Sequence, residues 1–191
     1  MHEPITPPRA LALVGMPGAG KTLCAQHLHQ RGFAHFRFGG IVVDEVTRRG
    51  WPITPENERL VREEFRAGEG MDAIARRALP HLHAALAARR SLVIDGLYGF
   101  SEYKTLRAEL DAAMVVVAVV SQRRLRYARL AARPERPLTP AEAQQRDYQE
   151  IDKLEKGGPI AIADYTLLND GAPAGLLAAL DALTAALGFY P

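Results

Sequence analysis

The sequence predicts an α/β domain with a mostly parallel, five-stranded sheet and helices on both of its faces. Short apolar runs rich in β-branched residues recur along the 191 residues, and stretches with helical spacing of apolar residues separate most of them. Parallel neighbouring strands need a crossover connection, which a helix supplies. With 48% hydrophobic residues, a chain of this length builds one sizeable core, so we expect a single domain over residues 1–191.

Five segments are the expected strands. Residues 33–38 have the weakest strand pattern, whereas four other apolar runs are typical of strands buried on both faces. These four are residues 9–15, 91–96, 114–120 and 164–170. The longest apolar run is far shorter than the ~20 residues that cross a bilayer, and the N-terminus lacks the pattern of a signal peptide. We therefore expect a soluble protein without membrane contact.

Two segments carry a clear helical pattern. Residues 21–32 end in a glycine typical of a helix C-cap, and residues 71–90 are alanine-rich, with Pro80 as an expected interruption. A third segment, residues 132–142, contains three prolines and two arginines. This composition predicts an irregular, exposed stretch, which is a candidate lid.

The charge balance excludes a nucleic-acid coat or a membrane-surface protein. There are 24 Lys and Arg residues against 22 Asp and Glu, for a net charge of +2, so any basic site must be local. The single cysteine, Cys24, excludes an intrachain disulfide and suits a reducing cytoplasm. We interpret Cys24 as a small buried apolar side chain and not as a reactive thiol.

A glycine-rich motif between the first expected strand and helix predicts a phosphate site. Its G-x-x-x-x-G-K-[ST] pattern lets backbone N–H groups converge on a phosphate at a helix N-terminus. Lys21 would reach the outer phosphates, and the Thr22 hydroxyl would ligate Mg²⁺. The alternative is a glycine-rich turn without a ligand. The expected nucleotide-binding residues are Gly15, Gly18, Ala19, Gly20, Lys21, Thr22 and Leu23.

Asp95 closes the third expected strand and is the natural partner of Thr22. An acid at the carboxyl end of a buried strand beside a phosphate loop holds a Mg²⁺ ligand water or orients the attacking group. We therefore expect Thr22 and Asp95 to form a metal site. The alternative is that Asp95 caps the turn that follows.

Basic residues cluster just before the candidate lid. Arg126, Arg129 and Arg133 are spaced by three and four residues, so on a helix they share one face. Mobile arginines that close over a transferring phosphoryl group stabilise its charge and exclude water. The alternative is a solvated basic helix face.

Together these motifs resemble the adenylate-kinase-like and dephospho-CoA-kinase-like P-loop proteins, in a poorly characterised branch of that superfamily. The resemblance runs from about residue 10 to residue 180 and rests on "GMPGAGKT", "EVTRRG", "TPEN", "EGMDAIARR", "VIDG", the R-L-x-x-R of Arg129 to Arg133, and "IADYTLLNDG". It implies the three-layer P-loop NTPase fold of nucleoside monophosphate kinases, with ATP as donor and Mg²⁺ as cofactor. It further implies a helical acceptor-side insert over about residues 41–89 and a short arginine lid over about residues 123–146.

The resemblance also places the loop at Asn169 beside the donor base, where the alternative is a plain turn after a strand. Two departures concern the acceptor side: Gly40 and Val43 stand where relatives carry an acid and an arginine, and Tyr98 stands where an arginine often follows the strand acid. Neither valine nor tyrosine holds a phosphate bidentately as arginine does, which counts against an ordinary monophosphate acceptor. The candidate replacements are Arg37, Arg48, Arg62 and Arg66.

The favoured hypothesis is ATP- and Mg²⁺-dependent phosphoryl transfer to a small molecule, a nucleotide or nucleoside. Lys21 and Asp95 would act with Arg129 and Arg133 as the catalytic set, and Arg126 would contact the nucleotide. Arg136 and Arg146 are further lid candidates. Three alternatives stay open: a kinase of dephospho-CoA or another small hydroxyl compound, a nucleotide-binding switch without efficient transfer, and a phosphatase-like NTPase. The departures on the acceptor side favour the switch, whereas Asp95 and the lid arginines favour the kinase.

Overall fold

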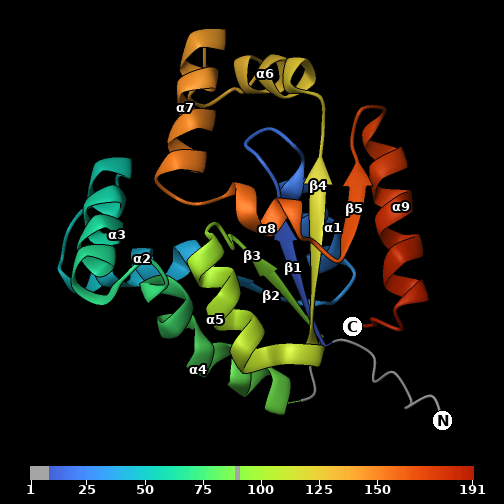
Figure 1. Ribbon diagram of the computed structural model, residues 1–191, viewed down its shortest axis with the longest axis horizontal. Coiled ribbons are helices and arrows are strands. Elements are labelled where there is room, and N and C mark those ends of the chain that lie inside the picture. Colours follow the sequence, from blue (N-terminus) through green and yellow to red (C-terminus); the bar gives the residue numbers. More distant parts are fainter. Residues whose placement is uncertain (1–8, 89–90) are drawn as a thin grey trace.

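The sheet has five parallel strands in the order β2-β3-β1-β4-β5, which confirms the predicted fold class (Figure 1). The structure is a computed structural model that describes residues 9–88 and 91–191. The strands are β1 (Ala10–Val14), β2 (Ala34–Arg37), β3 (Leu92–Asp95), β4 (Met114–Val120) and β5 (Tyr165–Leu168). β1 lies at the centre of the sheet and is buried at every position, so it carries the phosphate loop on the best-protected strand.

Helices pack on both faces of the sheet, as predicted. They are α1 (Lys21–Gln30), α2 (Phe38–Arg48), α3 (Pro55–Glu69), α4 (Ala73–Ala87), α5 (Phe100–Leu110), α6 (Arg123–Ala131), α7 (Pro140–Asp152), α8 (Gly157–Ala161) and α9 (Pro173–Ala186), with a short 3-10 turn η1 (Asp111–Ala113) after α5. Within the described residues, no helix is both long enough and apolar enough to span a membrane.

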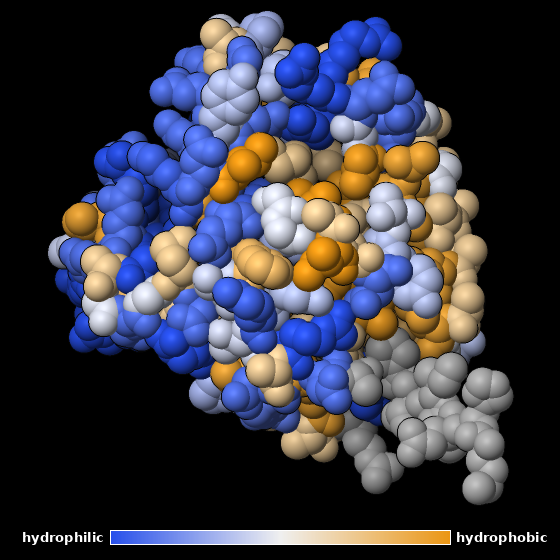
Figure 2. Space-filling view, in the orientation of Figure 1, coloured by the Kyte–Doolittle hydropathy of each residue, from blue (hydrophilic) through white to orange (hydrophobic). Residues whose placement is uncertain are grey.

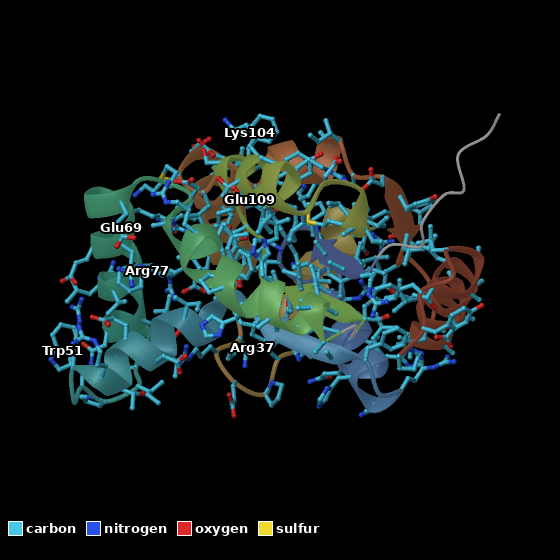
Figure 3. The ribbon with its side chains drawn as sticks, turned by 90° about the horizontal axis from the view of Figure 1, so that it is seen from below. Arg37, Trp51, Glu69, Arg77, Lys104 and Glu109 are labelled. Carbon is cyan, nitrogen blue, oxygen red and sulfur yellow. The ribbon has the colours of Figure 1, made fainter. Side chains whose placement is uncertain are left out.

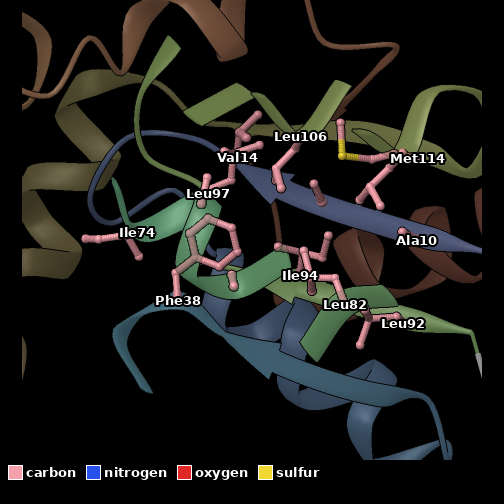
Figure 4. Close-up of a cluster of buried hydrophobic side chains, with 14 of the residues drawn as sticks. Ala10, Val14, Phe38, Ile74, Leu82, Leu92, Ile94, Leu97, Leu106 and Met114 are labelled. Atoms are coloured by element: carbon pink, nitrogen blue, oxygen red, sulfur yellow. The ribbon is translucent and has the colours of Figure 1, made fainter. Parts of the chain in front are cut away.

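Alternate residues of the strands point to opposite faces of the sheet and pack into two separate hydrophobic cores. On one face, Val14, Ile94 and Met114 pack with Phe38 of α2 and Leu106 of α5, in the larger core shown in Figure 4. The other face is covered by α1 and α9, and the buried Cys24 lies in this second core, where burial raises the pKa of its thiol to about 12. A thiol with that pKa is unreactive at neutral pH, which agrees with the interpretation from the sequence.

Two sequence expectations about individual elements were wrong. Pro80 does not interrupt α4, which runs through it from Ala73 to Ala87, with buried Ala78 and Leu82 packing on either side of the proline. Their burial compensates for the one backbone hydrogen bond that proline cannot make. β5 is not buried on both faces either: it is an edge strand, and only Leu167 of its four residues is buried.

Two Thr-Pro pairs begin the helices that flank the carboxyl edge of the sheet. Thr54 caps α3 by accepting a hydrogen bond from the Asn57 N–H, and Thr139 forms a capping box with Glu142 at the start of α7. Proline is well suited to the first helical position of each helix, because the backbone N–H that it lacks would have no intrahelical partner there. These caps fix where α3 and α7 start.

The helices α2, α3 and α4 form an insert beside β2, and α6 and α7 form a hairpin above the carboxyl ends of β1 and β4 (Figure 1). Figure 3 shows Glu69 of α3 facing Arg77 of α4 at the outer edge of the insert, where the Arg77 Nη2 donates to the Glu69 carboxylate at 2.5 Å. We call α6, residues 132–139 and α7 the lid hairpin. Residues 132–137 are exposed and lie outside regular structure, as their prolines predict.

Candidate functional site

A cavity of about 660 Å³ opens at the carboxyl ends of the strands, where open α/β sheets bind their ligands. The phosphate loop forms one wall, and the insert, the residues after β3 and the lid hairpin form the others. The charged and polar side chains on its wall are Lys21, Thr22, Gln26, His35, Arg37, Asp95, Tyr98, Arg129, Arg133, Arg146, Glu150 and Lys156. We call this space the transfer cavity.

Two glycines of the phosphate loop cannot be replaced without moving its neighbours. Gly15 has φ +146° and Gly20 has φ +115°, conformations that residues with a Cβ rarely adopt. A Cβ at Gly15 would lie 2.3 Å from the Val119 carbonyl oxygen, and a Cβ at Gly20 would lie 2.4 Å from the Asn169 Nδ2. The loop is therefore fixed between β4 and the segment after β5.

The first turn of α1 offers backbone donors to an anion. α1 begins at Lys21 with no side-chain cap and no acidic residue in its first turn, so its initial N–H groups have no capping partner. The Lys21 Nζ donates to the Gly15 carbonyl at 2.6 Å and to the Met16 carbonyl at 3.3 Å. Burial, followed by the nearby charge of Lys156, lowers the pKa of Lys21 to about 7. A bound polyanion would restore the charged form of this lysine.

Asp95 and Thr22 line the same cavity. Asp95 is the last residue of β3, in register with Leu13 of β1, and its Oδ2 lies 3.6 Å from the His35 Nε2. Burial lowers the pKa of His35, whose Nε2 has no hydrogen-bond partner within the described chain. A neutral imidazole next to Asp95 leaves that carboxylate available for other ligands. His35 carries no motif, so sequence reasoning did not single it out.

The oxygen donors in the cavity fit a Mg²⁺ ion that is shared with phosphates. Across residues 9–88 and 91–191, no three His, Cys, Asp or Glu side chains gather as a self-sufficient metal site. Thr22 and Asp95 nevertheless supply one hydroxyl and one carboxylate on the cavity wall. Mg²⁺ bound with phosphates takes only one or two protein ligands and keeps several waters, so these two residues are enough.

The three arginines expected on one helix face have different surroundings. Arg126 is buried, donates two hydrogen bonds to the Asp147 carboxylate at 2.9 and 2.7 Å, and donates a third to the Pro17 carbonyl at 3.1 Å. It does not line the transfer cavity. Arg133 does line it, although α6 ends at Ala131, two residues before this arginine. A nucleotide contact by Arg126 therefore stays a prediction, whereas its role in joining α6 to α7 is visible.

Arg129 links the phosphate loop to the segment after β5. Its Nη2 donates to the Asn169 carbonyl at 2.7 Å, and its Nη1 lies 3.5 Å from the Gly18 carbonyl. The Asn169 Nδ2 donates in turn to the Ala19 carbonyl at 2.7 Å, while its buried Oδ1 has no partner among the described residues. Asn169 supports the phosphate loop from behind, and its contact with a donor base stays a prediction.

Lys156 and Glu150 are the site residues that sequence reasoning missed. Lys156 is buried, donates to the Glu150 carboxylate, and places its Nζ 4.5 Å from the centroid of the Tyr98 ring. A cation thus stands beside Tyr98, where the resemblance stated from the motifs implies an arginine. Neither residue belongs to a recognisable motif, because only the folding of α7 and α8 brings them to the strand that carries Asp95. Sequence reasoning named Arg146, which lies one helical turn before Glu150. No other feature of the sequence pointed to Glu150 or Lys156 as site residues.

The four candidate replacement arginines are divided among three places. Arg37 lines the transfer cavity, while Arg62 and Arg66 line a second cavity beside it. Arg48 pairs with Glu45 on the outer surface of α2, with 72% of its side chain exposed. Arg48 lines neither of these two cavities.

The sheet order, the glycine loop and the converging cations define a P-loop kinase-like protein. Residues 11–153 match the family model AAA_18, described as an AAA domain. The chain belongs to the UPF0200 family: it is 35% identical to a UPF0200 protein of Thermococcus gammatolerans over 162 residues, 83% of this chain and 85% of that protein. A P-loop kinase-like domain implies nucleotide binding, and the resemblance identified from the motifs is confirmed.

Solved structures with low sequence identity share the fold. Shikimate kinase from Acinetobacter baumannii in complex with shikimate superposes with a TM-score of 0.59 at 18% identity, over 95% of this chain and 94% of that one. Dephospho-CoA kinase from Campylobacter jejuni gives a TM-score of 0.56 at 13% identity, over 94% of this chain and 97% of that one. At these identities the similarity concerns the fold alone.

Proposed function

We propose that this protein is a phosphotransferase that moves the terminal phosphoryl group of ATP to a small-molecule acceptor in the presence of Mg²⁺. The observation that carries this proposal is the convergence of Asp95, Arg133, Arg146 and Lys156 on the cavity that contains Lys21. A nucleotide switch needs the phosphate loop, but it does not need cations from the lid hairpin and from the residue that precedes α8. Such cations are what phosphoryl transfer requires to neutralise the transferring group.

Each charged residue has a distinct place in the proposed reaction. The phosphate-loop N–H groups and Lys21 bind the phosphates, and Thr22 and Asp95 hold Mg²⁺, which would neutralise charge on the phosphates when bound. Arg129 and Arg133 lie on the lid side of the cavity and neutralise the transferring group. The bond from phosphorus to the ADP oxygen breaks as the bond to the acceptor oxygen forms, and a hydroxyl acceptor gives its proton to an adjacent base or to water.

The acceptor in this proposal is a nucleotide or nucleoside, bound between the insert and the lid hairpin. Arg37 and Lys156 supply positive charge on the acceptor side, although Val43 and Tyr98 do not. A second candidate is a small hydroxyl compound, of the kind that shikimate and dephospho-CoA represent in the structural neighbours. Asp95 favours it, because a carboxylate on the cavity wall is suited to orient a hydroxyl and to accept its proton.

An acceptor screen tests the proposal. Protein, ATP and Mg²⁺ are incubated with pooled nucleosides, nucleoside monophosphates, dephospho-CoA and sugar acids, and products are followed by mass spectrometry. We expect one acceptor class to gain a phosphoryl group in the wild type and not in Lys21→Met. The matched control is Arg124→Gln, which alters an exposed cation of α6 outside the transfer cavity. ADP release that is equal without acceptor would indicate an NTPase, and tight ATP binding without turnover would indicate a switch.

A further inference from the structure

A second cavity, of about 730 Å³, lies between α3 of the insert and α7 of the lid hairpin. We call it the α3–α7 groove. Its charged side chains are Arg59, Arg62, Glu63, Arg66, Glu142, Arg146, Glu150 and Lys153. Figure 1 shows α3 and α7 both to the left of the strands, and Figure 2 shows mostly hydrophilic surface over this part of the molecule. Arg146 and Glu150 also line the transfer cavity, so the two spaces meet at these side chains.

The groove carries excess positive charge, because five Arg and Lys side chains line it against three Glu side chains. The Glu142 carboxylate accepts hydrogen bonds from the N–H and hydroxyl of Thr139, at 2.7 and 2.8 Å. The Glu150 carboxylate accepts from Lys156 and from the Arg146 Nε. Two cations of the groove, Arg59 and Lys153, have no acidic partner among the residues that the structure describes. Unpaired cations facing one cavity attract an anionic group.

Arg66 is built into the wall of the groove. Its side chain is only 12% exposed, its Nη2 lies 3.6 Å from the Glu102 Oε1, and its buried Nε has no hydrogen-bond partner within the described chain. Glu102 is itself fully buried, and its Oε2 accepts from the N–H groups of Tyr98 and Gly99. The guanidinium is therefore held in place while part of its donor capacity stays unused. A buried donor without a partner is costly, so an acceptor oxygen from a ligand would be stabilising there.

We propose that the α3–α7 groove binds a phosphate group at the far end of the acceptor. This inference rests on the proposed function and defines the acceptor more closely as an elongated molecule. The end that receives the phosphoryl group lies in the transfer cavity, and a second, anionic end lies on Arg59, Arg66 and Lys153. Arg146 lines both the transfer cavity and the α3–α7 groove, so the two spaces adjoin at its side chain. One elongated molecule can therefore occupy both of them.

A phosphate titration tests the groove without turnover. Protein saturated with Mg²⁺ and the non-hydrolysable analogue AMP-PNP is titrated with inorganic phosphate, and backbone amide shifts are followed by NMR. We expect saturable shifts in α3 and α7, and a dissociation constant at least about fivefold weaker in the double variant Arg59→Gln/Lys153→Gln. The matched control is Arg123→Gln/Arg124→Gln, which removes two exposed cations of α6 that line neither space and should leave the dissociation constant unchanged.

Three results would overturn the inference: no shifts in α3 and α7, displacement of AMP-PNP by phosphate, or equal weakening in both double variants. The last would show general attraction to a basic surface. The titration needs no acceptor, so a titration without shifts in α3 and α7 leaves the proposed function standing. A screen without products would overturn the proposed function and would not alter the result of the titration. For an acceptor found by the screen, the double variant Arg59→Gln/Lys153→Gln is expected to raise KM about tenfold. For an analogue of that acceptor without the remote phosphate, the double variant and the wild type should have the same KM.

Discussion

The ammonium group of Lys156 lies 4.5 Å from the centroid of the Tyr98 ring and donates to the Glu150 carboxylate. This places a buried cation on the wall of the transfer cavity, where the sequence of the β3 turn offers only tyrosine. Burial keeps the pKa of Lys156 below its usual value, and the Glu150 carboxylate opposes that shift. The molecule thus supplies positive charge to this wall from the residue that precedes α8 and not from the segment after Asp95.

Lys156→Ala is expected to lower kcat/KM about a hundredfold, because one positioned donor to a phosphoryl group is lost. Lys156→Arg should recover part of that activity. The alanine also leaves the buried Glu150 carboxylate without its Lys156 partner, which lowers stability. Thermal melting must therefore be measured in parallel. In the double variant Lys156→Met/Glu150→Leu we expect stability to return without activity, and recovery of both would contradict a role for Lys156 at the site.

The depressed pKa of Lys21 predicts that ATP binding takes up a proton above pH 7. Free Lys21 titrates near pH 7 and not at its usual 10.5, so it is largely neutral at pH 8.5, whereas the phosphate-bound form is charged. Calorimetry in two buffers of different ionisation enthalpy should report uptake approaching one proton at pH 8.5 and little at pH 6. Lys21→Met is the control, and uptake that persists in it would assign the proton to another group.

The same pKa fixes the sign of a stability effect. Between pH 7 and pH 10.5 the unfolded chain protonates Lys21 and the folded chain does not, so the unfolded state binds more protons. The contribution of Lys21 to the free energy of unfolding therefore rises with pH across this window. Urea unfolding at pH 7 and pH 9.5 should show a smaller rise for Lys21→Met than for the wild type, and equal rises would contradict the assignment.

Breaking the buried pair of Arg126 and Asp147 is expected to destabilise the fold by about 3–5 kcal/mol, because the remaining charge is left without its partner. Both side chains are less than 10% exposed. Urea unfolding of Arg126→Ala measures the loss. Arg126→Met/Asp147→Leu, which removes both charges, should be much closer to the wild type, and a double variant as unstable as the single one would show that packing and not charge is responsible.

Gly15→Ala is expected to abolish nucleotide binding, since its Cβ would lie 2.3 Å from the Val119 carbonyl oxygen. Gly175→Ala is the matched control, because no atom lies within 4 Å of a Cβ there. It should keep full affinity and gain about 0.4–1 kcal/mol of stability. Titration with a fluorescent ATP analogue distinguishes the two variants, and retained binding by Gly15→Ala would refute the loop geometry.

Asp95→Asn is expected to separate nucleotide binding from Mg²⁺ dependence. The amide keeps the size of the carboxylate but loses its charge, so Mg²⁺ should be required at about tenfold higher concentration for transfer. Affinity for ATP measured in excess EDTA should not fall. An unchanged Mg²⁺ requirement would remove Asp95 from the metal site and leave it as a cap for its own turn.

The sequence was sufficient for the order of the elements, the phosphate loop and the place of Asp95 at the end of β3, because their signals are local: apolar runs, fixed glycine spacing and an acid at a strand end. It was not sufficient for Lys156, Glu150 and His35, which reach the site only through the packing of distant segments. It also grouped Arg126 with Arg133 by helical spacing alone. Spacing predicts that two residues lie on one face of a helix, but it does not predict which of them has a buried ion-pair partner. Here Asp147 binds Arg126.

The Arg126 guanidinium is bonded at once to α7 through Asp147 and to the phosphate loop through the Pro17 carbonyl. Moving the lid hairpin away from that loop would break the contact with Pro17 and the contacts of Arg129 with Gly18 and Asn169, whereas separating α6 from α7 would break a buried ion pair. The buried pair of Arg126 and Asp147 therefore predicts that α6 and α7 stay joined in any such motion.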